Sequence, residues 1–509
     1  MKCWPGISLQ HIEGEQEHTQ PDNKEYSLEC PRECIEGFSP VKRKHTPWWE
    51  RSFTYKTVLQ RAEQLYQINV CEDRWLVCQP TGAGHLLVID GEGKALLDRL
   101  ARPQTLADLI AVYGHISFER LQKLLQIFLQ AGIVSTNDTP ASRQPELIPQ
   151  IQTLQAWLHI TNSCNLGCAY CYLAKTPEHM SEETAFRAVD ALFRSARRHH
   201  FERVTLRYAG GEASLRLHHV LTVHDYAQEV ARRHDIHLTG VLLSNGVFFT
   251  DDMIKQLKER RISVMISLDG VGRYHDMQRP FVSGRSSFQQ VNRTIRRLLL
   301  HGLVPSISIT VSQSNAAGLP ELMAYLLEHN LPFGMNYYRD NEHAVHPDAL
   351  QFAEQEIITA IRKAMLVIEA HLPRRPLLAS FIDKANIAEA HQYTCSVGRN
   401  YLVVDQHGGI AKCHAQMEQT VATIEADDPL WSVRNDQRGV QGLSVDEKEG
   451  CKSCPWRYWC AGGCPVLTYR LTGRYDIKSP NCHVYQTLFP EVLRLEALRL
   501  LKYGNVFDC

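Results

Sequence analysis

The sequence predicts an α/β protein built around a partial (β/α)6 barrel, with a small N-terminal module and a cysteine-rich C-terminal domain. Three observations lead to this fold class. The length of 509 residues corresponds to about three domains of average size. Six short apolar segments alternate with helical segments between residues 155 and 340. Ten of the 16 cysteines form two groups, three at 164–171 and seven between 395 and 482.

The composition limits the class of protein. Apolar residues make up 44% and charged residues 22%, which is ordinary for a globular protein. The net charge of -1 argues against a broad nucleic-acid-binding surface. The N-terminus lacks the apolar core of a secretory signal, and no apolar stretch is long enough to span a bilayer. We therefore expect a cytoplasmic protein without a membrane partner, whose cysteines serve metal or redox chemistry instead of a disulfide framework.

Two segments near the N-terminus lack regular patterns. Residues 1–65 are rich in His, Glu, Pro and Lys and show no periodicity, which predicts a flexible region. Residues 138–153 are polar and contain proline, so they are expected to form a linker.

Between these segments, residues 66–138 predict a winged-helix-like module. The apolar segments 75–80 and 85–90 have strand character and flank a glycine-containing turn. Thr105 and Ser117 stand at N-cap positions of predicted helices. Apolar residues at helical spacing define three helices: 93–100, 106–113 and 118–132.

Residues 154–345 predict a parallel sheet curved into a partial TIM-like barrel. The expected strands are 156–160, 204–208, 238–243, 263–268, 304–311 and 333–338. Residues 346–394 are expected to be bridging helices. Chemically distinctive residues follow four of the strands: Cys164, Gly210 to Glu212, Ser244 with Asn245, and Asp269. Barrels of this type assemble their active sites where the carboxyl ends of the strands meet.

The loop after the first barrel strand carries Cys164, Cys168 and Cys171. Cysteine thiolates are the usual ligands of iron–sulfur clusters, and three of them can hold three irons of a cubane cluster. The loop has no fourth cysteine, so the fourth iron would stay open to an external ligand. The alternative is a zinc site.

The Cys-x3-Cys-x2-Cys spacing, with Tyr170 before the last cysteine, resembles the signature of the radical S-adenosylmethionine (SAM) superfamily. This resemblance implies a [4Fe–4S] cluster whose open iron binds SAM, and a deoxyadenosyl radical released by one electron. Glu212 would accept a hydrogen bond from the SAM ammonium group. Arg279 would hold its carboxylate, or would alternatively be a surface ion-pair partner. The implied SAM contacts are Tyr170, Gly210, Gly211, Glu212, Ser244, Asn245, Ser267 and Arg279.

The C-terminal cysteines, in residues 395–485, resemble those of the SPASM domain, which carries two auxiliary [4Fe–4S] clusters. The chain would thus hold three clusters. The resemblance assigns Cys395, Cys413 and Cys464 to the auxiliary cluster nearer the active site. It assigns Cys451, Cys454, Cys460 and Cys482 to the outer one. The nearer cluster lacks a fourth ligand. Its fourth iron would either stay open, for example to substrate sulfur, or bind a distant residue, for which Cys509 is a candidate. The alternative for Cys451 to Cys464 is a zinc knuckle, and residues 486–509 are expected to form a tail.

SPASM enzymes act on peptides or proteins, which narrows the expected function. Sulfatase maturases carry an Asp base after the second SPASM cysteine, whereas this chain has His414 there. The pair of Cys413 and His414 resembles the one found in peptide maturases that form thioether or carbon–carbon crosslinks. His414 would be a base near its ordinary pKa or a structural residue. The N-terminal module would bind the leader of a precursor peptide as an added strand.

The sequence therefore predicts a radical SAM oxidoreductase that crosslinks a ribosomally made precursor peptide (RiPP maturation). Its one-electron reductant would be an external protein such as a flavodoxin or ferredoxin. Three alternatives remain. They are a sulfatase-type maturase that forms formylglycine, a radical enzyme acting on RNA, and a non-catalytic iron–sulfur protein that binds peptides.

Overall fold

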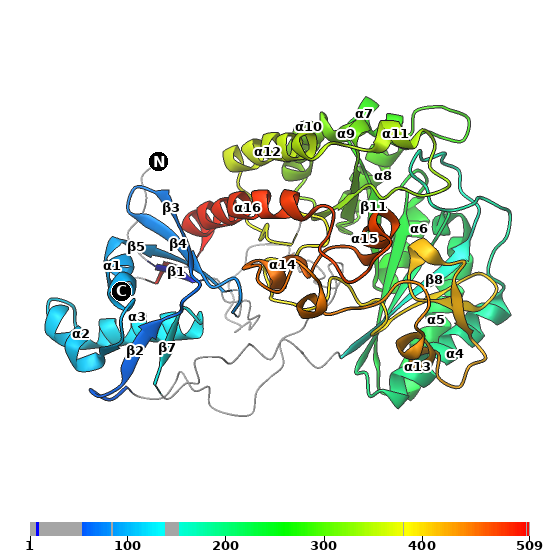
Figure 1. The fold of residues 1–509 in the computed structure, drawn as a ribbon. Coiled ribbons are helices and arrows are strands. Elements are labelled where there is room, and N and C mark those ends of the chain that lie inside the picture. The colour runs from blue at the N-terminus through cyan, green and yellow to red at the C-terminus, as the bar shows by residue number, and fades with distance from the viewer. Residues whose placement is uncertain are drawn as a thin grey trace.

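The computed structural model describes residues 7–9, 53–82, 85–137, 152–379, 381–504 and 506–507. Its largest element is a nine-stranded sheet with the order β13-β12-β11-β10-β9-β8-β14-β15-β16, seen at the right of Figure 1. A three-stranded sheet comes from the N-terminal part of the chain, and a five-stranded sheet combines four N-terminal strands with one strand from the C-terminal end. In the described part, no helix is both long and apolar enough to cross a membrane.

Six consecutive parallel strands form the larger part of this sheet, from its β13 edge to β8, as the alternating pattern predicts. They are β8 (Thr153–Thr161), β9 (Arg203–Gly210), β10 (His237–Ser244), β11 (Ile262–Ser267), β12 (Ser306–Val311) and β13 (Phe333–Tyr337). Eight of the nine residues of β8 are buried, which is usual for a parallel strand covered on both faces.

Helices join these strands and cover the sheet. The predicted ones are α4 (Glu182–Arg198), α5 (Leu217–Arg233), α6 (Asp251–Glu259), α8 (Phe288–Leu300), α10 (Leu319–Glu328) and α12 (Glu354–Ala370). Ser181 caps α4, which has acidic residues in its first turn and basic residues in its last, so its ends suit the helix dipole. Three short helices were not predicted: α7 (Arg273–Gln278), α9 (Gln313–Ala316) and α11 (Pro347–Leu350).

The cysteine-rich region is part of the large sheet, which the sequence did not predict. Its strand β14 (Tyr401–Val404) pairs in parallel with β8. Strands β15 (Gly409–Ala411) and β16 (Thr420–Thr423) continue the sheet outward. The rest of the region is irregular chain with three short helices: α13 (Pro429–Asn435), α14 (Arg457–Cys460) and α15 (Pro465–Thr472).

The N-terminal module contains the predicted helices α1 (Gly91–Arg99), α2 (Leu106–Val112) and α3 (Phe118–Gln130), with Thr105 and Ser117 as N-caps. It also contains the two predicted strands, β4 (Arg74–Cys78) and β5 (Leu86–Asp90). Its unpredicted strands are β2 (Val58–Arg61), β3 (Tyr66–Cys71), β6 (Gln104–Thr105) and β7 (Val134–Thr136). Two further unpredicted strands, β1 (Ile7–Leu9) and β17 (Val506–Phe507), extend the sheet of β3, β4 and β5 from the two ends of the chain.

The predicted flexible region 1–65 needs a correction, because β1 and β2 lie inside it. β1 pairs with β5, and β2 pairs with β6 and β7. Its other residues up to 52 lie outside the described residues, as does most of the predicted linker.

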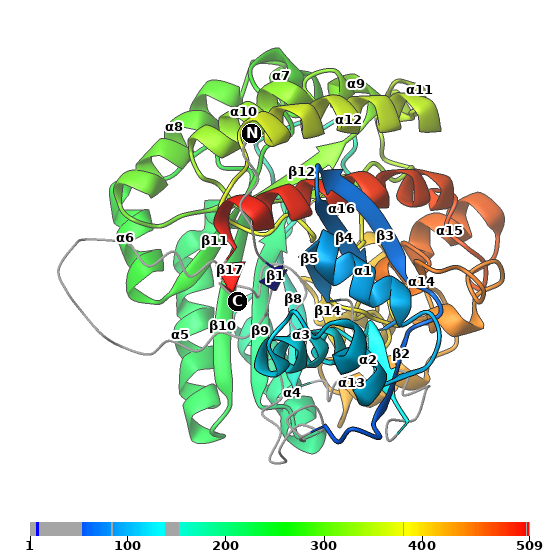
Figure 2. The same cartoon turned by 90° about the vertical axis from the view of Figure 1, so that its left-hand side faces the viewer.

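The prediction of a C-terminal tail is wrong. Residues Cys482–Tyr503 form the long helix α16, whose buried residues include Leu488, Phe489 and Val492. One side of α16 contacts α12, and another contacts β3, β4 and β5 of the N-terminal module, as Figure 2 shows. Because it is covered on several sides, α16 has no single apolar stripe by which the sequence would reveal a helix.

Candidate functional site

The first cysteine loop is fixed by main-chain hydrogen bonds to the segment that follows α7. Gly167 N donates to Pro280 O at 2.7 Å, and Ala169 N donates to Gln278 O at 2.9 Å. Val282 N donates to Asn165 O at 3.1 Å. The thiols of Cys164, Cys168 and Cys171 are all half-buried, and Cys168 interacts electrostatically with the other two.

The two glycines after β9 allow an unusually close backbone approach to this loop. Gly211 N donates to Thr161 O at 2.6 Å. A Cβ on Gly211 would lie 2.4 Å from Ser163 O, and one on Gly210 would lie 2.3 Å from Thr161 O. The sequence analysis predicted that these glycines contact SAM. In the structure, they bring the end of β9 against the chain that enters the cysteine loop.

Glu212 is buried, and its carboxylate joins the ends of β9 and β10. Its Oε1 accepts from Ser244 Oγ at 2.8 Å and from Ser214 N at 3.1 Å. Its Oε2 accepts from Asn245 N at 2.6 Å. A carboxylate has about four acceptor positions, so one remains for a ligand. The side chain of Asn245 donates to Asn165 Oδ1 at 2.7 Å, so the predicted SAM contacts in this group first bind one another.

Tyr170, Asp269 and Arg279 form a buried polar group beside the loop. Tyr170 Oη donates to Asp269 Oδ2 at 2.6 Å, and Arg279 Nη1 donates to Tyr170 Oη. Arg279 is only 8% exposed, so it is not a surface ion-pair partner. Burial alone would lower the pKa of Arg279, but nearby Cys168, Tyr170 and Asp269 raise it well above its ordinary value.

Two details complete this side of the site. Arg279 Nε is buried and has no hydrogen-bond partner among the described residues, which leaves one donor for a ligand. Ser267, also a predicted SAM contact, is the half-buried last residue of β11 and lies in register with Ser308 of β12.

The cysteines assigned to the nearer auxiliary cluster lie close to the first loop. Cys413 and Cys464 are 7% and 8% exposed and belong to an apolar cluster around Trp157 and Val403. Cys395 and Cys171 pack against the same cluster. One apolar cluster therefore adjoins a cysteine of the first loop and all three cysteines of this set.

His414 is stacked on Trp157, with ring centroids 4.6 Å apart. Tyr401 Oη lies 3.1 Å from His414 Nδ1. Burial and the positive charges of Lys384 and Arg339 lower the pKa of His414 to about 3. A pKa this low argues against the first of the two sequence hypotheses, in which His414 is a base that titrates near its ordinary pKa.

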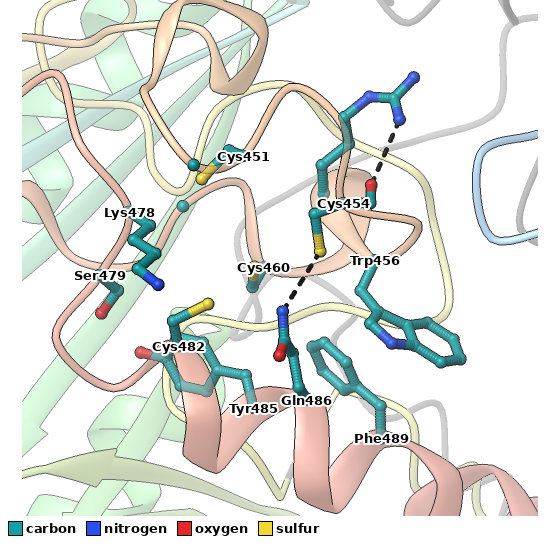
Figure 3. A pocket seen from close by; sticks show the side chains of 13 residues that line it. Cys451, Cys454, Trp456, Cys460, Lys478, Ser479, Cys482, Tyr485, Gln486 and Phe489 are labelled. Atoms are coloured by element: carbon teal, nitrogen blue, oxygen red, sulfur yellow. Dashed lines mark hydrogen bonds between the residues drawn. The ribbon is translucent and has the colours of Figure 1, made fainter.

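The four cysteines assigned to the outer cluster line a single cavity (Figure 3). The cavity has an empty volume of about 320 Å³, including space open to solvent. Trp456, Tyr485 and Phe489 supply aromatic walls. Burial raises the pKa of Cys451 to about 11 and that of Cys460 to about 12. These thiols are protonated without metal, so metal binding has to displace protons.

The described residues were also considered for a site that holds a single metal ion. In the described part of the chain, no three His, Cys, Asp or Glu side chains converge closely enough to hold one metal ion. Cys509, the candidate additional ligand, lies outside the described residues.

Sequence reasoning missed two charged side chains that face the cysteines. Arg339 donates to the sulfur of Cys464, and Lys448, only 3% exposed, interacts electrostatically with Cys451 and Cys395. Arg339 directly follows the last predicted strand, so the strand-end argument would have singled it out. No sequence signal points to Lys448.

Comparisons with known proteins agree with the barrel part of this geometry. Residues 158–322 match the radical SAM superfamily. The chain is 28% identical to the sporulation killing factor maturation protein SkfB of Bacillus subtilis, over 31% of this chain and 36% of that protein. It is 31% identical to the antilisterial bacteriocin subtilosin biosynthesis protein AlbA of the same organism, over 32% of this chain and 34% of that protein. The chain thus spans about a third of the length of these two relatives.

A longer match involves the cysteine-type anaerobic sulfatase-maturating enzyme of Clostridium perfringens. It is 22% identical over 60% of this chain and 86% of that enzyme. A solved structure, native anSMEcpe with bound AdoMet and Cp18Cys peptide, shares the fold with a TM-score of 0.52 and 18% identity. That match covers 68% of this chain and 99% of the other.

Proposed function

We propose that this chain, which contains a radical SAM domain at residues 158–322, is a maturase of a ribosomally made precursor peptide. It would remove a hydrogen atom from a residue of that peptide and install a thioether or carbon–carbon crosslink. The similarity to SkfB and AlbA, a maturation protein and a bacteriocin biosynthesis protein, supports a peptide substrate.

One observation carries the proposal. A half-buried three-thiol loop at the carboxyl end of β8 adjoins the same apolar cluster as Cys395, Cys413 and Cys464. Four further cysteines surround a cavity of their own. Thiols are suitable donors for iron–sulfur clusters, and this arrangement fits one accessible cluster followed by two more enclosed ones.

The residues have distinct proposed roles. Cys164, Cys168 and Cys171 would hold the SAM-binding [4Fe–4S] cluster, and the seven C-terminal cysteines would hold the two auxiliary clusters. SAM and the clusters supply one-electron chemistry: a radical that removes hydrogen, and an acceptor for the surplus electron. Arg279 would direct its free Nε–H to the SAM carboxylate, and Glu212 would offer its remaining acceptor position. The apolar cluster around Trp157 would keep water away from the radical.

The N-terminal module, residues 53–137, would recognise the leader of the precursor. The outer strand β3 has β4 as its one partner strand in the described part of the chain. An extended peptide can add to such an edge through main-chain hydrogen bonds. We assign residues 154–345 to the radical SAM core, 346–394 to the bridge, and 395 to the end of α16 to the SPASM domain. The enzyme would work in the cytoplasm with a flavodoxin or ferredoxin as reductant.

A second candidate is formylglycine formation on a sulfatase. The match to the Clostridium perfringens enzyme, over 60% of this chain, favours it. The neutral, stacked His414 at the position of the expected Asp base counts against it.

The test is co-expression with each short peptide encoded beside this chain, followed by mass spectrometry. A loss of two hydrogen atoms, abolished in C168A, supports crosslinking. Conversion of a sulfatase peptide to an aldehyde would support the second candidate. If every neighbouring peptide keeps its mass while SAM is cleaved, the crosslinking proposal is wrong.

A further inference from the structure

Arg339 lies just beyond β13, and its guanidinium reaches into the cysteine-rich domain. Nε donates to Cys464 Sγ at 3.1 Å. Nη2 donates to both carboxylate oxygens of Asp383, at 2.8 and 2.9 Å, and Nη1 donates to Tyr337 O at 3.0 Å. Asp383 is fully buried, whereas the Arg339 side chain is 17% exposed. All three nitrogens are engaged, so the donor aimed at the sulfur has a fixed direction.

The charge on Arg339 is permanent. The guanidinium of an arginine stays protonated in proteins, and the carboxylate of Asp383, 2.8 Å away, stabilises its positive charge. A fixed positive charge in a site of low polarity acts more strongly on a neighbouring group than it would in water.

The segment that carries Arg339 also holds the first cysteine loop. Asn341 Nδ2 donates to Tyr170 O at 3.2 Å, and Val345 N donates to Ala169 O at 2.7 Å. Residues 339–345 therefore contact both a cysteine of the nearer auxiliary set and the loop of Cys168. This double attachment fixes Arg339 in place.

We propose that Arg339 is a positioning residue that raises the reduction potential of the cluster held by Cys464, so that this cluster accepts the electron released by the substrate. The inference rests on the proposed function. A hydrogen bond and a positive charge at a ligating sulfur stabilise the reduced, more negative state of an iron–sulfur cluster.

Once the carbon radical has formed, it bonds to a heteroatom or carbon of the peptide, whose bond to hydrogen breaks. The hydrogen leaves as a proton to water or a base. One electron passes to the oxidised nearer cluster, which is reduced by one electron.

The outer cysteine set also has a positive neighbour, because Lys478 lines its cavity and interacts electrostatically with Cys451 and Cys482. In the described residues, however, no charged side chain donates a hydrogen bond to a sulfur of this set. Gln486 Nε2 donates to Cys454 Sγ at 3.6 Å, which is long and carries no charge. Lys448 interacts electrostatically with Cys451 of the outer set and Cys395 of the nearer set, so it does not favour one set. Arg339 thus distinguishes the nearer cluster.

The experiment uses the full chain in a C164A/C168A/C171A background, so that only auxiliary clusters remain after anaerobic reconstitution. Redox titration followed by electron paramagnetic resonance gives one midpoint potential per cluster. In R339Q/D383N, which removes the positive charge without leaving Asp383 charged and unpaired, we expect one potential to fall and the other to stay. Arg339→Lys, which keeps the charge but loses the fork, should give a smaller fall.

Arg470 provides the matched control. It donates to Asp340 O at 2.5 Å and Ala415 O at 3.2 Å from an exposed position, so R470Q should leave both potentials unchanged. Equal potentials in the parent and both Arg339 variants would overturn the inference, as would an equal shift of both clusters. Loss of the nearer cluster from both variants would make Arg339 structural. A parent with fewer than two auxiliary clusters would instead contradict the proposed function.

Discussion

The two cysteine groups differ in part in how far solvent reaches them, because Cys395, Cys454 and Cys482 are half-buried like the first loop and only the other four C-terminal cysteines are buried. The three thiols of the first loop are all half-buried, and the buried Nε of the nearby Arg279 has no hydrogen-bond partner among the described residues. In the C-terminal domain, four of the seven cysteines are between 5% and 8% exposed, and Arg339 already engages one sulfur. Because the surroundings of a metal site control access and redox potential, the first group suits a ligand that enters and leaves. The second group suits clusters that accept and pass on electrons.

The scaffolds of the two groups differ as well. The first loop is attached by main-chain hydrogen bonds to a packed parallel barrel. Most of the C-terminal cysteines lie on irregular chain, and aromatic side chains complete the outer cavity. The barrel should therefore stay folded without metal, whereas the C-terminal domain should depend on it more strongly.

The largest expected effect comes from Cys168→Ala. It removes one of three ligands, so the first cluster should be lost together with SAM cleavage, while both auxiliary clusters remain. Iron analysis and chromatography of 5'-deoxyadenosine measure this. The matched control is Cys78→Ala, a fully buried cysteine of β4, which should lower stability and leave the iron content intact. SAM cleavage by C168A would refute the assignment of this loop.

In the C-terminal domain, Phe489→Ala should be the most damaging change of packing. Phe489 is fully buried, lines the outer cavity, and lies 5.7 Å from Trp456 between ring centroids. Its removal should cost about 3–5 kcal/mol in unfolding free energy and release the outer cluster selectively. Leu366→Ala, at a position 66% exposed, should cost under about 0.5 kcal/mol. An F489A protein with full iron content would show that the aromatic wall is dispensable.

Gly211→Ala tests whether close backbone approach holds the first loop. The new Cβ would meet Ser163 O at 2.4 Å and Asn162 O at 2.6 Å, which should cost about 1–3 kcal/mol. SAM cleavage should fall while the auxiliary clusters keep their spectra. Gly334→Ala in β13, whose Cβ would meet nothing within 4 Å, is the control. Equal thermal stability and activity of the two variants would contradict this role.

The barrel should also contain an acid-sensitive residue away from the cysteines. Burial lowers the pKa of His224 from 6.5 to about 4. Below pH 6.5 the unfolded chain gains a proton that the folded protein does not, so stability falls by roughly 2 kcal/mol by about pH 5. His224→Gln should remove this part of the pH dependence. Denaturant unfolding of both proteins at about pH 7 and pH 5 measures it, and equal pH dependence would contradict it.

Where the alternating pattern was strong, sequence prediction of the parallel strands and the helices between them succeeded. The helices Glu182–Arg198, Asp251–Glu259 and Leu319–Glu328 have the predicted bounds, because each is amphipathic and packs one face on the sheet. Elements whose environment depends on distant chain were missed. β14 is four residues long, and α16 is covered on several sides.

For the site, local spacing revealed the cysteines, because a cluster needs thiols at short intervals. The same approach did not reveal Arg339 or Asp383, whose bonds join residues 44 and 125 positions apart. It also predicted that Glu212 binds only SAM, although the folded chain brings Ser244 and Asn245 to the same carboxylate. Contacts of this kind arise only when the strand ends are assembled.

The pairing of β14 with β8 has a consequence for synthesis on the ribosome. Until Tyr401–Val404 have been translated, β8 is an edge strand, and its unpaired backbone groups can join other chains. A chain that ends at residue 394 should therefore aggregate even though it includes every strand of the barrel. Nascent chains would need protection until the C-terminal domain emerges.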